Sequence, residues 1–498
     1  MASTPRNPGW AALALVAILI MLAAAVASPA QNFFTLHDFD GADGRGPGGA
    51  LVQATDGNLY GTTAYGAMRD AGTIFKITPS GRLTTLYSFC PQSGCMDGAG
   101  PEALIQARDG DFYGATYAGG ANATNAACNP NTLGCGTVFK ITPGGELTTL
   151  YSFCSQSGCA DGANPPSALV QDANGDFYGT TFSGGSSGVC EDYGCGTVFK
   201  ITPSGTLTTL HSFDDHQDGA TPNGLIQGAD GNFYGTTSGV SNPGTVFKIT
   251  PNGMLTTLYS FCSQSGCSDG GGPGALVQGT DGNFYGITNG GGATDYGTVF
   301  KITPGGMLTT LYSFCSQSGC PDGSGAYSAL VQGTDGNFYG TTYFGPAGNS
   351  CDTCGTLFRI TPSGTLTTLH RFDYTDGADV YYGLVQDTNG NFYGTTLGGG
   401  TASGCSGGCG TVFGLSVGLG PFVETRPTSG KVGSAIKILG TNLKGATGVT
   451  FYGMPAVFKV ISPTEIGAVV PAGATNGPVQ VATPGGTLSS NVPFWVRQ

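Results

Sequence analysis

The chain has 498 residues, of which 89 are glycine and 10 per cent are charged. Its formal net charge is −13, from 18 basic and 31 acidic residues. This acidity argues against nucleic acid and anionic membrane surfaces as partners. The low total charge fits an extracellular surface rich in Gly, Ser and Thr.

Residues 1–30 predict a secretory signal peptide. Arg6 lies in a short polar start, and an apolar run of 17 residues follows from 11 to 27. Small residues allow cleavage after Ala27 or after Ala30. An uncleaved anchor is the alternative, because a run of this length is at the lower limit for a membrane span. No other segment could cross a membrane, so after cleavage we do not expect an integral membrane protein.

One phrase recurs along the chain: Asp-Gly-Asn-Phe-Tyr-Gly-Thr-Thr, then Gly-Thr-Val-Phe-Lys-Ile-Thr-Pro, then Leu-Thr-Thr-Leu-Tyr-Ser-Phe. Its central Tyr occurs in seven copies spaced 51 to 65 residues apart. A period of this size indicates a propeller or another repeat array. The seven tyrosines are Tyr60, Tyr113, Tyr178, Tyr234, Tyr285, Tyr339 and Tyr393.

Each unit predicts four short strands, as the fifth unit illustrates. An apolar strand at 275–278 leads through an Asp-Gly turn into a second strand at 284–288. A third strand at 297–303 ends in a Pro-Gly-Gly turn, and a Thr-rich fourth strand occupies 308–314. No stretch of the repeats has a 3.6-residue apolar period, so the sequence predicts an all-β fold.

Seven units of four strands predict a seven-bladed β-propeller, which we place at residues 31–417. The last unit stops after its third strand at 410–413, and the missing strand is found at 34–39, ahead of the first complete unit. This N-terminal strand is expected to complete the last blade and leave no free sheet edge. An open β-solenoid is the alternative, but it would not need a strand displaced to the other end of the chain.

All 16 cysteines fall into close pairs, which in an exported chain predicts disulfides. Zinc is the rival interpretation of the Cys-x-x-Cys spacing at 351–354, but none of the four His lies within a pair. Each bridge would close a very short loop and chiefly stiffen it. The expected pairs are Cys90 with Cys95, Cys128 with Cys135, Cys154 with Cys159, Cys190 with Cys195, Cys262 with Cys267, Cys315 with Cys320, Cys351 with Cys354, and Cys405 with Cys409.

Residues 421–498 predict a second, smaller β domain with the length of an immunoglobulin-like sandwich. Alternating segments at 435–439, 449–451 and 479–481 are expected strands. This part contains no Cys, so its core must hold it together without disulfides.

Two resemblances follow from these motifs. The repeat unit resembles the GloVer tandem repeat of exported bacterial proteins over about residues 33–413, which implies a secreted or surface protein and names no activity. The chain ends at Gln498 without a sorting motif or terminal helix, so we do not expect cell-wall attachment. The C-terminal part resembles an IPT/TIG domain, a spacer or interaction module, through Pro427-x-Ser429-Gly430, Ile438-x-Gly440-x-Asn442-Leu443, Val449-x-Phe451 and Val470-Pro471.

The loops on the two faces of the predicted ring differ. The turns after the first and third strands of each unit are uniformly tight, whereas the other loops vary in length and contain every cysteine. Because variable loops on a rigid scaffold commonly carry function, we expect any binding site on the variable face, between blades 2–3 and blades 6–7.

An Asp-Gly pair recurs in each blade-to-blade loop on that face. Ring closure would arrange the carboxylates in a circle, which could bind a cation such as calcium. The favoured alternative is turn chemistry, in which Asp bonds nearby backbone and Gly takes the left-handed conformation. No other cofactor is expected. The residues are Asp43, Asp97, Asp161, Asp218, Asp269, Asp322 and Asp376.

Other candidate residues follow the repeat and are interpreted as structural. The Phe-Tyr-Gly tyrosines could form a sugar-stacking platform, but their place inside a strand of every blade favours packing between blades. His37, His211 and His370 take the position of Tyr in the fourth strand, whereas His216 lies in a blade-to-blade loop beside acidic residues.

No catalytic motif stands out, because the five Glu are unpaired and Gly-x-Ser-x-Gly, phosphate-loop and His-Glu-x-x-His patterns are absent. We therefore predict no catalytic residues. The expected function is that of a monomeric, secreted or surface-exposed binding module whose ligand is a polysaccharide or another surface protein. A propeller hydrolase or lyase acting on a carbohydrate polymer is the runner-up, and a structural spacer is the third hypothesis.

Overall fold

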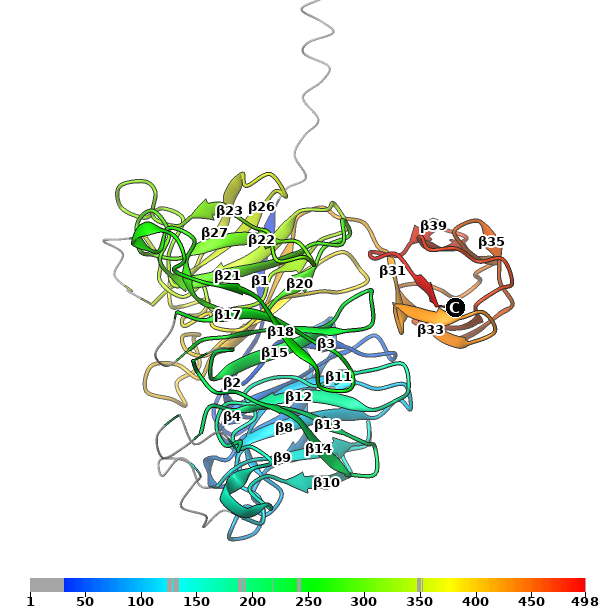
Figure 1. The fold of residues 1–498 in the computed structure, drawn as a ribbon. Coiled ribbons are helices and arrows are strands. Elements are labelled where there is room, and N and C mark those ends of the chain that lie inside the picture. Colours follow the sequence, from blue (N-terminus) through cyan, green and yellow to red (C-terminus); the bar gives the residue numbers. More distant parts are fainter. Residues whose placement is uncertain are drawn as a thin grey trace, which may run out of the picture.

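The structure, a computed structural model, is built almost entirely of β-sheets (Figure 1). The predicted signal peptide lies outside the residues it describes. Within the described part, no helix is long and apolar enough to cross a membrane. The described residues are 31–122, 128, 134–186, 190, 194–216, 218–239, 243–346, 351 and 353–497.

Seven sheets form the blades of the propeller, and in two of them the innermost strand is split in two. Blade 1 contains β2 (Arg45–Pro47), β3 (Val52–Gln53), β4 (Leu59–Tyr65), β5 (Thr73–Ile77) and β6 (Leu83–Ser88). Blade 2 contains β7 (Ala99–Gln106), β8 (Phe112–Ala118), β9 (Thr137–Ile141) and β10 (Leu147–Ser152). Blade 3 contains β11 (Val170–Gln171), β12 (Phe177–Thr181), β13 (Thr197–Ile201) and β14 (Leu207–Ser212).

The remaining blades repeat this order from the inner to the outer strand. Blade 4 contains β15 (Pro222–Gln227), β16 (Phe233–Thr237), β17 (Thr245–Ile249) and β18 (Leu255–Ser260). Blade 5 contains β19 (Gly271–Pro273), β20 (Val277–Gln278), β21 (Phe284–Gly290), β22 (Thr298–Ile302) and β23 (Leu308–Ser313). Blade 6 contains β24 (Val331–Gln332), β25 (Phe338–Thr342), β26 (Thr356–Ile360) and β27 (Leu366–Arg371). Blade 7 contains β28 (Val385–Gln386), β29 (Phe392–Thr396), β30 (Thr411–Ser416) and the N-terminal strand β1 (Asn32–Asp38).

The N-terminal strand closes the ring, as the sequence predicts. Strand β1 pairs antiparallel with β30, from Asn32 opposite Ser416 to Asp38 opposite Thr411. The outermost strand of blade 7 therefore comes from the opposite end of the repeat array. This pairing confirms the closed propeller over the solenoid, and it covers the edge that β30 would otherwise expose.

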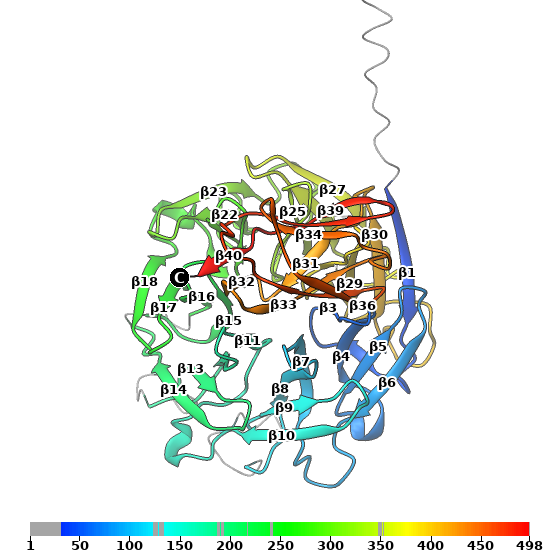
Figure 2. The ribbon, with the colours of Figure 1, turned by 90° about the vertical axis from the view of Figure 1, so that its right-hand side faces the viewer.

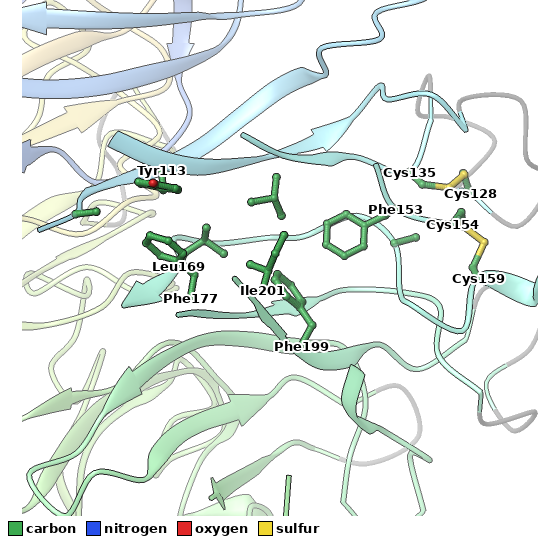
Figure 3. Close-up of a cluster of buried hydrophobic side chains, with 13 residues drawn as sticks. Tyr113, Cys128, Cys135, Phe153, Cys154, Cys159, Leu169, Phe177, Phe199 and Ile201 are labelled. Carbon is green, nitrogen blue, oxygen red and sulfur yellow. A yellow bond between two sulfur atoms is a disulfide. The ribbon is translucent and has the colours of Figure 1, made fainter. Parts of the chain in front are cut away.

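The Phe-Tyr-Gly core packs neighbouring blades together. Each Tyr from blade 1 to blade 6 lies with its ring centre 4.0 to 4.2 Å from the Phe that opens the same strand of the next blade. The following Gly is required, because a Cβ on Gly286 would lie 2.5 Å from the Phe300 ring. Figure 3 shows this packing between blades 2 and 3, where Tyr113 lies beside Phe177. The tyrosines are thus core residues and do not form an exposed platform.

A glutamine in every unit adds a connection that the sequence reasoning missed. Its side-chain oxygen accepts a hydrogen bond from the turn of the preceding blade, as in Ala229 N to Gln278 Oε1 at 2.9 Å. Its amide donates to its own turn, as in Gln278 Nε2 to Gly282 O at 3.1 Å. Among the described residues, the interblade bond recurs at six of the seven interfaces between neighbouring blades, which we call seams. The bond explains why Gln ends every innermost strand.

The C-terminal part forms a small sandwich with an apolar core that includes Ile438, Phe451 and Phe494. It lies against the tight-turn face of the propeller (Figure 2). One sheet contains β31 (Val423–Arg426), β33 (Ala435–Gly440), β37 (Glu465–Val469) and β36 (Phe458–Ser462). The others contain β35 (Met454–Pro455), β34 (Gly448–Phe451), β38 (Val479–Thr483) and β39 (Gly486–Ser489), and the pair β32 (Ser429–Lys431) and β40 (Trp495–Arg497).

Candidate functional site

The loop aspartates lie in seven separate hydrogen-bond networks. Each carboxylate contacts the Tyr or His of the preceding outermost strand at 2.5 to 3.0 Å. Tyr and His therefore exchange at this position because both reach the same carboxylate. Among the described residues, the only group of three His, Cys, Asp or Glu side chains close enough to share a metal is Cys128, Cys135 and Cys154. The sulfurs of this group belong to two disulfides.

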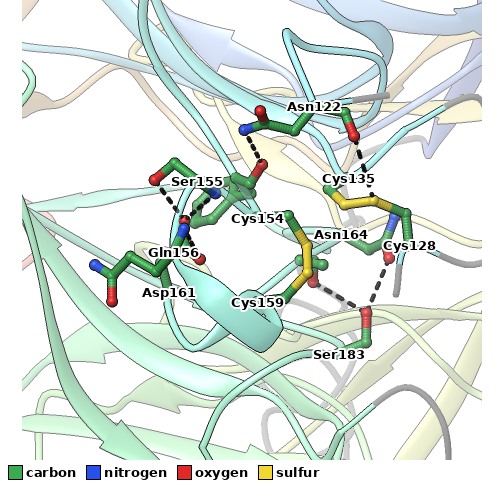
Figure 4. The surroundings of a disulfide bond; sticks show 12 residues. Asn122, Cys128, Cys135, Cys154, Ser155, Gln156, Cys159, Asp161, Asn164 and Ser183 are labelled. Atoms are coloured by element: carbon green, nitrogen blue, oxygen red, sulfur yellow. Dashed lines mark hydrogen bonds between the residues drawn. A yellow bond between two sulfur atoms is a disulfide. The ribbon is translucent and has the colours of Figure 1, made fainter. Parts of the chain in front are cut away.

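Among the described residues, Oδ1 of Asp322 has no hydrogen-bond partner, whereas both oxygens of Asp161 are occupied (Figure 4). One oxygen accepts from Tyr151 Oη at 2.8 Å, from Ser155 N at 2.9 Å and from Ser155 Oγ at 3.1 Å. The other accepts from Gln156 N at 3.2 Å. These are the contacts that turn chemistry requires, and they leave little coordination capacity for a ligand.

The histidines do not converge either. His37, His211 and His370 each contact the aspartate of their own loop. His216 is exposed, and its backbone N–H donates to Asp214. The structure thus places all four in loop networks and brings none of them together.

Eight disulfides stiffen the loops of the variable face. Their sequence separations are three to seven residues, and no described cysteine is free. All the expected pairs are confirmed, and the pair with zinc-like spacing is bridged like the rest. The bridges join Cys90 with Cys95, Cys128 with Cys135, Cys154 with Cys159, Cys190 with Cys195, Cys262 with Cys267, Cys315 with Cys320, Cys351 with Cys354, and Cys405 with Cys409.

Two of these bridges lie side by side in the loops of blades 2 and 3. Figure 4 shows the bridge between Cys128 and Cys135 next to the bridge between Cys154 and Cys159, beside the Asp161 network. A loop held by both a disulfide and a filled carboxylate network is stiff, so it presents a fixed surface to solvent.

A pocket of about 480 Å³ opens on the variable face where blades 7, 1 and 2 meet. Tyr381 and Tyr382 reach it from the connection between β27 and β28, and Tyr65 from the end of β4. Tyr117, in β8, and Glu102, in β7, line it from blade 2. We refer to it as the tyrosine pocket.

Further aromatic rings extend from this pocket towards blade 6. Tyr381 stacks on Tyr327 with ring centres 5.1 Å apart, and Tyr343 meets Tyr327 edge-on at 5.8 Å. Tyr381 also meets Tyr382 edge-on at 5.4 Å. Tyr65 is 52% exposed and Tyr381 is 40% exposed, so ring surface is accessible from solvent. Such an array can stack against several sugar rings in succession.

Glu102 gives the tyrosine pocket an unusual carboxyl group. Burial raises its pKa well above the usual range. Burial also raises the pKa values of Tyr117, Tyr381 and Tyr382, and the nearby Glu102 adds to these shifts. A carboxyl group among phenols presents hydrogen-bond donors as well as acceptors to a ligand.

Asp70 and Arg45 form the opposite edge of the pocket. Arg45 donates from both Nε and Nη2 to the two Asp70 oxygens, at 3.0 and 2.5 Å. This pairing lowers the pKa of Asp70. The Arg45 guanidinium also lies 5.0 Å from the centre of the Tyr65 ring, which fixes that ring beside the pocket. The pocket therefore combines fixed aromatic rings with two carboxyl groups whose pKa values are shifted in opposite directions.

The pocket lies on the face where the sequence led us to expect any binding site, but its residues were not among the predicted ones. The pocket lies between the inserts of blades 7 and 2, over the short loop of blade 1, and its tyrosines do not come from the repeated Phe-Tyr-Gly core. Aligning the units by their innermost strand would have given the signal. At the position of Glu102 and Tyr382, the other units have smaller residues, namely Gly49, Ser167, Asn223, Gly274 and Ser328.

Comparison with known families agrees with this architecture. The model of the Gloeobacter/Verrucomicrobia repeat matches residues 25–127, 96–268 and 263–456, which together span most of the chain. The chain belongs to this repeat family. Residues 423–495 match the IPT/TIG domain. No curated protein matches the chain.

The solved structures to which this chain is similar are distant from it in sequence. The extracellular domain of a hybrid two-component system from B. thetaiotaomicron shares 12% identity with a TM-score of 0.50, covering 94% of this chain and 59% of that one. A fungal alcohol oxidase of the AA5 family, in complex with copper, shares 12% identity with a TM-score of 0.49, covering 94% and 99%. A gluconolactonase from Xanthomonas campestris shares 12% identity with a TM-score of 0.38, covering 64% and 88%. At this identity the likeness concerns the fold alone.

Proposed function

We propose that the protein binds an extracellular polysaccharide at the tyrosine pocket without cleaving it. The observation that carries this proposal is the grouping of accessible tyrosine rings around Glu102. Sugar rings present apolar faces that stack on aromatic side chains, and hydroxyl groups that both donate and accept hydrogen bonds. A pocket of about 480 Å³ is within the usual range for small-ligand sites.

The rest of the chain fits an exported binding module. Eight disulfides indicate an oxidising compartment, and repeat and IPT/TIG matches support an interaction role at or outside the cell surface. In this proposal residues 1–30 direct export, residues 31–417 carry the binding site, and residues 421–498 act as a spacer or second interaction domain of a monomer. The ligand of the tyrosine pocket is a neutral or weakly acidic glycan, because Asp70 and the net charge of −13 disfavour highly acidic chains.

The test is a glycan and insoluble-polysaccharide binding screen with purified 31–498, followed by Tyr65→Ala and Tyr381→Ala. Each variant is expected to weaken binding about fivefold, since one stacked ring contributes about 1 kcal/mol. Tyr296→Ala is the matched control, because Tyr296 is 50% exposed in the blade 5 insert on the same face. A chelator arm tests calcium at the seven loop aspartates.

Two results would overturn the proposal. A blank screen would favour a surface protein as the ligand, or a spacer role. Equal losses for Tyr381→Ala and Tyr296→Ala would move the site away from the tyrosine pocket.

Carbohydrate hydrolysis is the second candidate function, and one observation favours it. Glu102 and Asp70 both line the pocket, and their pKa values are shifted in opposite directions, as an acid and a base require. Asp70 is, however, bound to Arg45 and to Gly66 N at 2.7 Å, which weakens it as a base. Release of soluble sugar that is abolished in both Glu102→Gln and Asp70→Asn would establish this function in place of simple binding.

A further inference from the structure

A second cavity lies on the opposite face, between the propeller and the C-terminal sandwich. The sandwich is joined to blade 1 by a hydrogen bond from Thr464 Oγ1 to Thr55 O at 2.7 Å. It is joined to blade 7 by a contact of 3.0 Å between Thr388 Oγ1 and Thr441 Oγ1. Towards blades 2 to 4 the two parts enclose a cavity of about 350 Å³, and we refer to it as the interdomain crevice.

Two arginines from different parts of the chain line this crevice. Arg108 lies in the tight turn of blade 2, and Arg497 lies in β40 of the sandwich. Arg108 is the only charged residue at its position of the seven turns, because the other units have Thr55, Ala173, Ala229, Thr280, Thr334 and Thr388. One of its nitrogens donates to Ala173 O at 2.7 Å, which holds the guanidinium over the turn of blade 3.

The two guanidinium groups repel each other. Burial lowers the pKa of Arg108, the nearby Asp172 raises it, and the positive charge of Arg497 lowers it by a smaller amount. Within the described part of the chain, neither arginine forms an ion pair. A like-charged pair across a cavity is unfavourable unless an anion lies between its members.

The other charges around the crevice are already paired. Arg426 donates from two nitrogens to Glu424, at 2.9 and 3.2 Å. Lys437 lies 3.7 Å from Glu465 in the adjoining cavity.

Asp172, the remaining acid, is committed to its own turn. It accepts backbone hydrogen bonds from Asn174 at 2.8 Å and from Asp176 at 3.1 Å. The unmatched charge of the crevice is therefore positive, in a chain whose net charge is −13.

We propose that the interdomain crevice binds an anionic group, a carboxylate or sulfate, of an acidic saccharide. A guanidinium presents a planar pair of N–H donors that matches such a group. The crevice is also lined by Trp495, which adds an indole ring and its N–H donor. This site is separate from the tyrosine pocket, because it lies on the tight-turn face and shares no lining residue with that pocket.

The experiment measures binding of three oligosaccharides of equal length by calorimetry, one carrying carboxylates, one carrying sulfates and one neutral. Binding of a charged probe is expected to weaken at least tenfold in Arg108→Gln and in Arg497→Gln, and to weaken as salt rises from about 50 to about 200 mM. Arg82→Gln is the matched control, because Arg82 is an exposed turn cation of blade 1 outside the crevice. Comparing the two charged probes separates a carboxylate ligand from a sulfate ligand.

Thermal melting without ligand distinguishes binding from a structural role. Removing one of two repelling charges should leave the melting temperature of Arg497→Gln unchanged or slightly raised. A clear fall would show that Arg497 stabilises the interface, and would contradict the proposal. Binding of the charged probe that both arginine variants leave unchanged would also overturn it. Glu102→Gln should bind the charged probe normally, which keeps this test independent of the tyrosine pocket.

Discussion

Blade 7 and the other six blades arise from the same repeat, yet their interfaces are built from different interactions. In blades 1 to 5 the Lys of the third strand lies 5.5 to 5.9 Å from the ring of the neighbouring Tyr. Blade 7 has Gly414 at that position, and the Phe34 ring of β1 takes the space, where a Cβ on Gly414 would lie 2.3 Å from it. Phe34 instead meets Tyr393 edge-on at 6.3 Å. The closing blade thus replaces a charged contact by an apolar one.

The seam between blade 7 and blade 1 differs in a second way. Blade 1 opens its second strand with Leu59 where the other blades have Phe, so Tyr393 has no stacked aromatic partner in the next blade. Hydrogen bonds partly compensate, because Gln53 Nε2 donates to Thr388 Oγ1 at 2.9 Å and Thr388 also contacts Thr441 of the sandwich. The comparison teaches that a repeat array closes into a ring only if the interface between its last and first blades differs from the others, because both chain ends lie there.

Of the changes considered, the removal of β1 is expected to have the largest effect on thermal stability. A chain that begins at residue 40 exposes the edge of β30 and the apolar surface that Phe33, Phe34 and Phe39 cover. We expect loss of cooperative thermal unfolding, or a fall in melting temperature above about 10 °C, measured by circular dichroism. A synthetic peptide of residues 31–39 should restore the transition, and the same peptide with Phe34→Asp should not. An unchanged transition in the shortened chain would show that the closing strand is dispensable.

Replacing Asp387, in the tight turn of blade 7, is expected to raise the stability of the protein, whereas removing β1 lowers it. Burial raises the pKa of Asp387 to about 6, and the nearby Glu424 contributes in the same direction. Among the described residues its Oδ2 has no hydrogen-bond partner. A carboxyl whose folded pKa lies above its unfolded value is most favourable below about pH 4, and its contribution to stability falls as the pH rises through about 6.

Asp387→Asn should therefore stabilise the protein at about pH 7.5, by about 1–3 kcal/mol, and should change stability little at about pH 4. Chemical denaturation at the two pH values measures this difference. Asp172→Asn is the matched control, because Asp172 has the same position in blade 3 but lies near Arg108 and accepts from Tyr178 Oη at 3.4 Å. A gain of equal size in the control would show that the environment of blade 7 is not the cause.

The exchange Phe284→Leu makes the interface between blades 4 and 5 resemble the interface between blades 7 and 1, where Leu59 takes the position of this Phe. It removes the ring that lies 4.1 Å from Tyr234 while keeping an apolar side chain of similar size. The expected loss is about 1–2 kcal/mol of unfolding free energy, measured by denaturant titration. Phe338→Leu should cost the same at the next seam, where Tyr285 is the partner. If neither exchange lowers the free energy of unfolding, the interface that contains Leu59 is no weaker than the other blade interfaces.

The smallest effect on stability is expected from replacing Asp281, in the tight turn of blade 5. Burial opposes ionisation of Asp281, but contacts with Lys301, Asn283 and Tyr285 outweigh it and lower the pKa to about 2. Such a carboxylate stabilises above about pH 4, and the contribution is lost as the pH falls towards about 2. Because the side chain is 41% exposed, Asp281→Asn should cost less than about 1 kcal/mol at about pH 7. The two stability curves should meet near pH 2, and a constant offset would contradict this explanation.

Several features of the fold could be predicted because they repeat. Turn residues, strand lengths and the displaced strand at 34–39 specify seven blades and their closure, since each depends on local sequence or on a count of units. The strand bounds agree to within about three residues, and the fifth unit has an additional short strand, β19, ahead of the predicted inner strand at 275–278. The close spacing of paired cysteines likewise allowed their partners to be predicted.

The loop aspartates show where reasoning from the repeat was incomplete. Their position in the loops could be predicted, but their partners could not. The donors, such as Tyr312 for Asp322, come from the preceding strand, and only the folded loop brings them within 2.9 Å. Interactions of this kind depend on the path of the backbone and not on spacing.

The sequence by itself determined the repeat, the number of blades and the covalent bridges, because those depend on neighbours in the chain. Only the tertiary structure decided the candidate sites. Glu102 and Tyr382 are 280 positions apart and share a pocket because closure places blade 7 beside blades 1 and 2. Arg108 and Arg497 meet because the sandwich lies against the tight-turn face. Both sites are made of residues that depart from the repeat, and such departures acquire chemical meaning only when the ring and the sandwich bring them together.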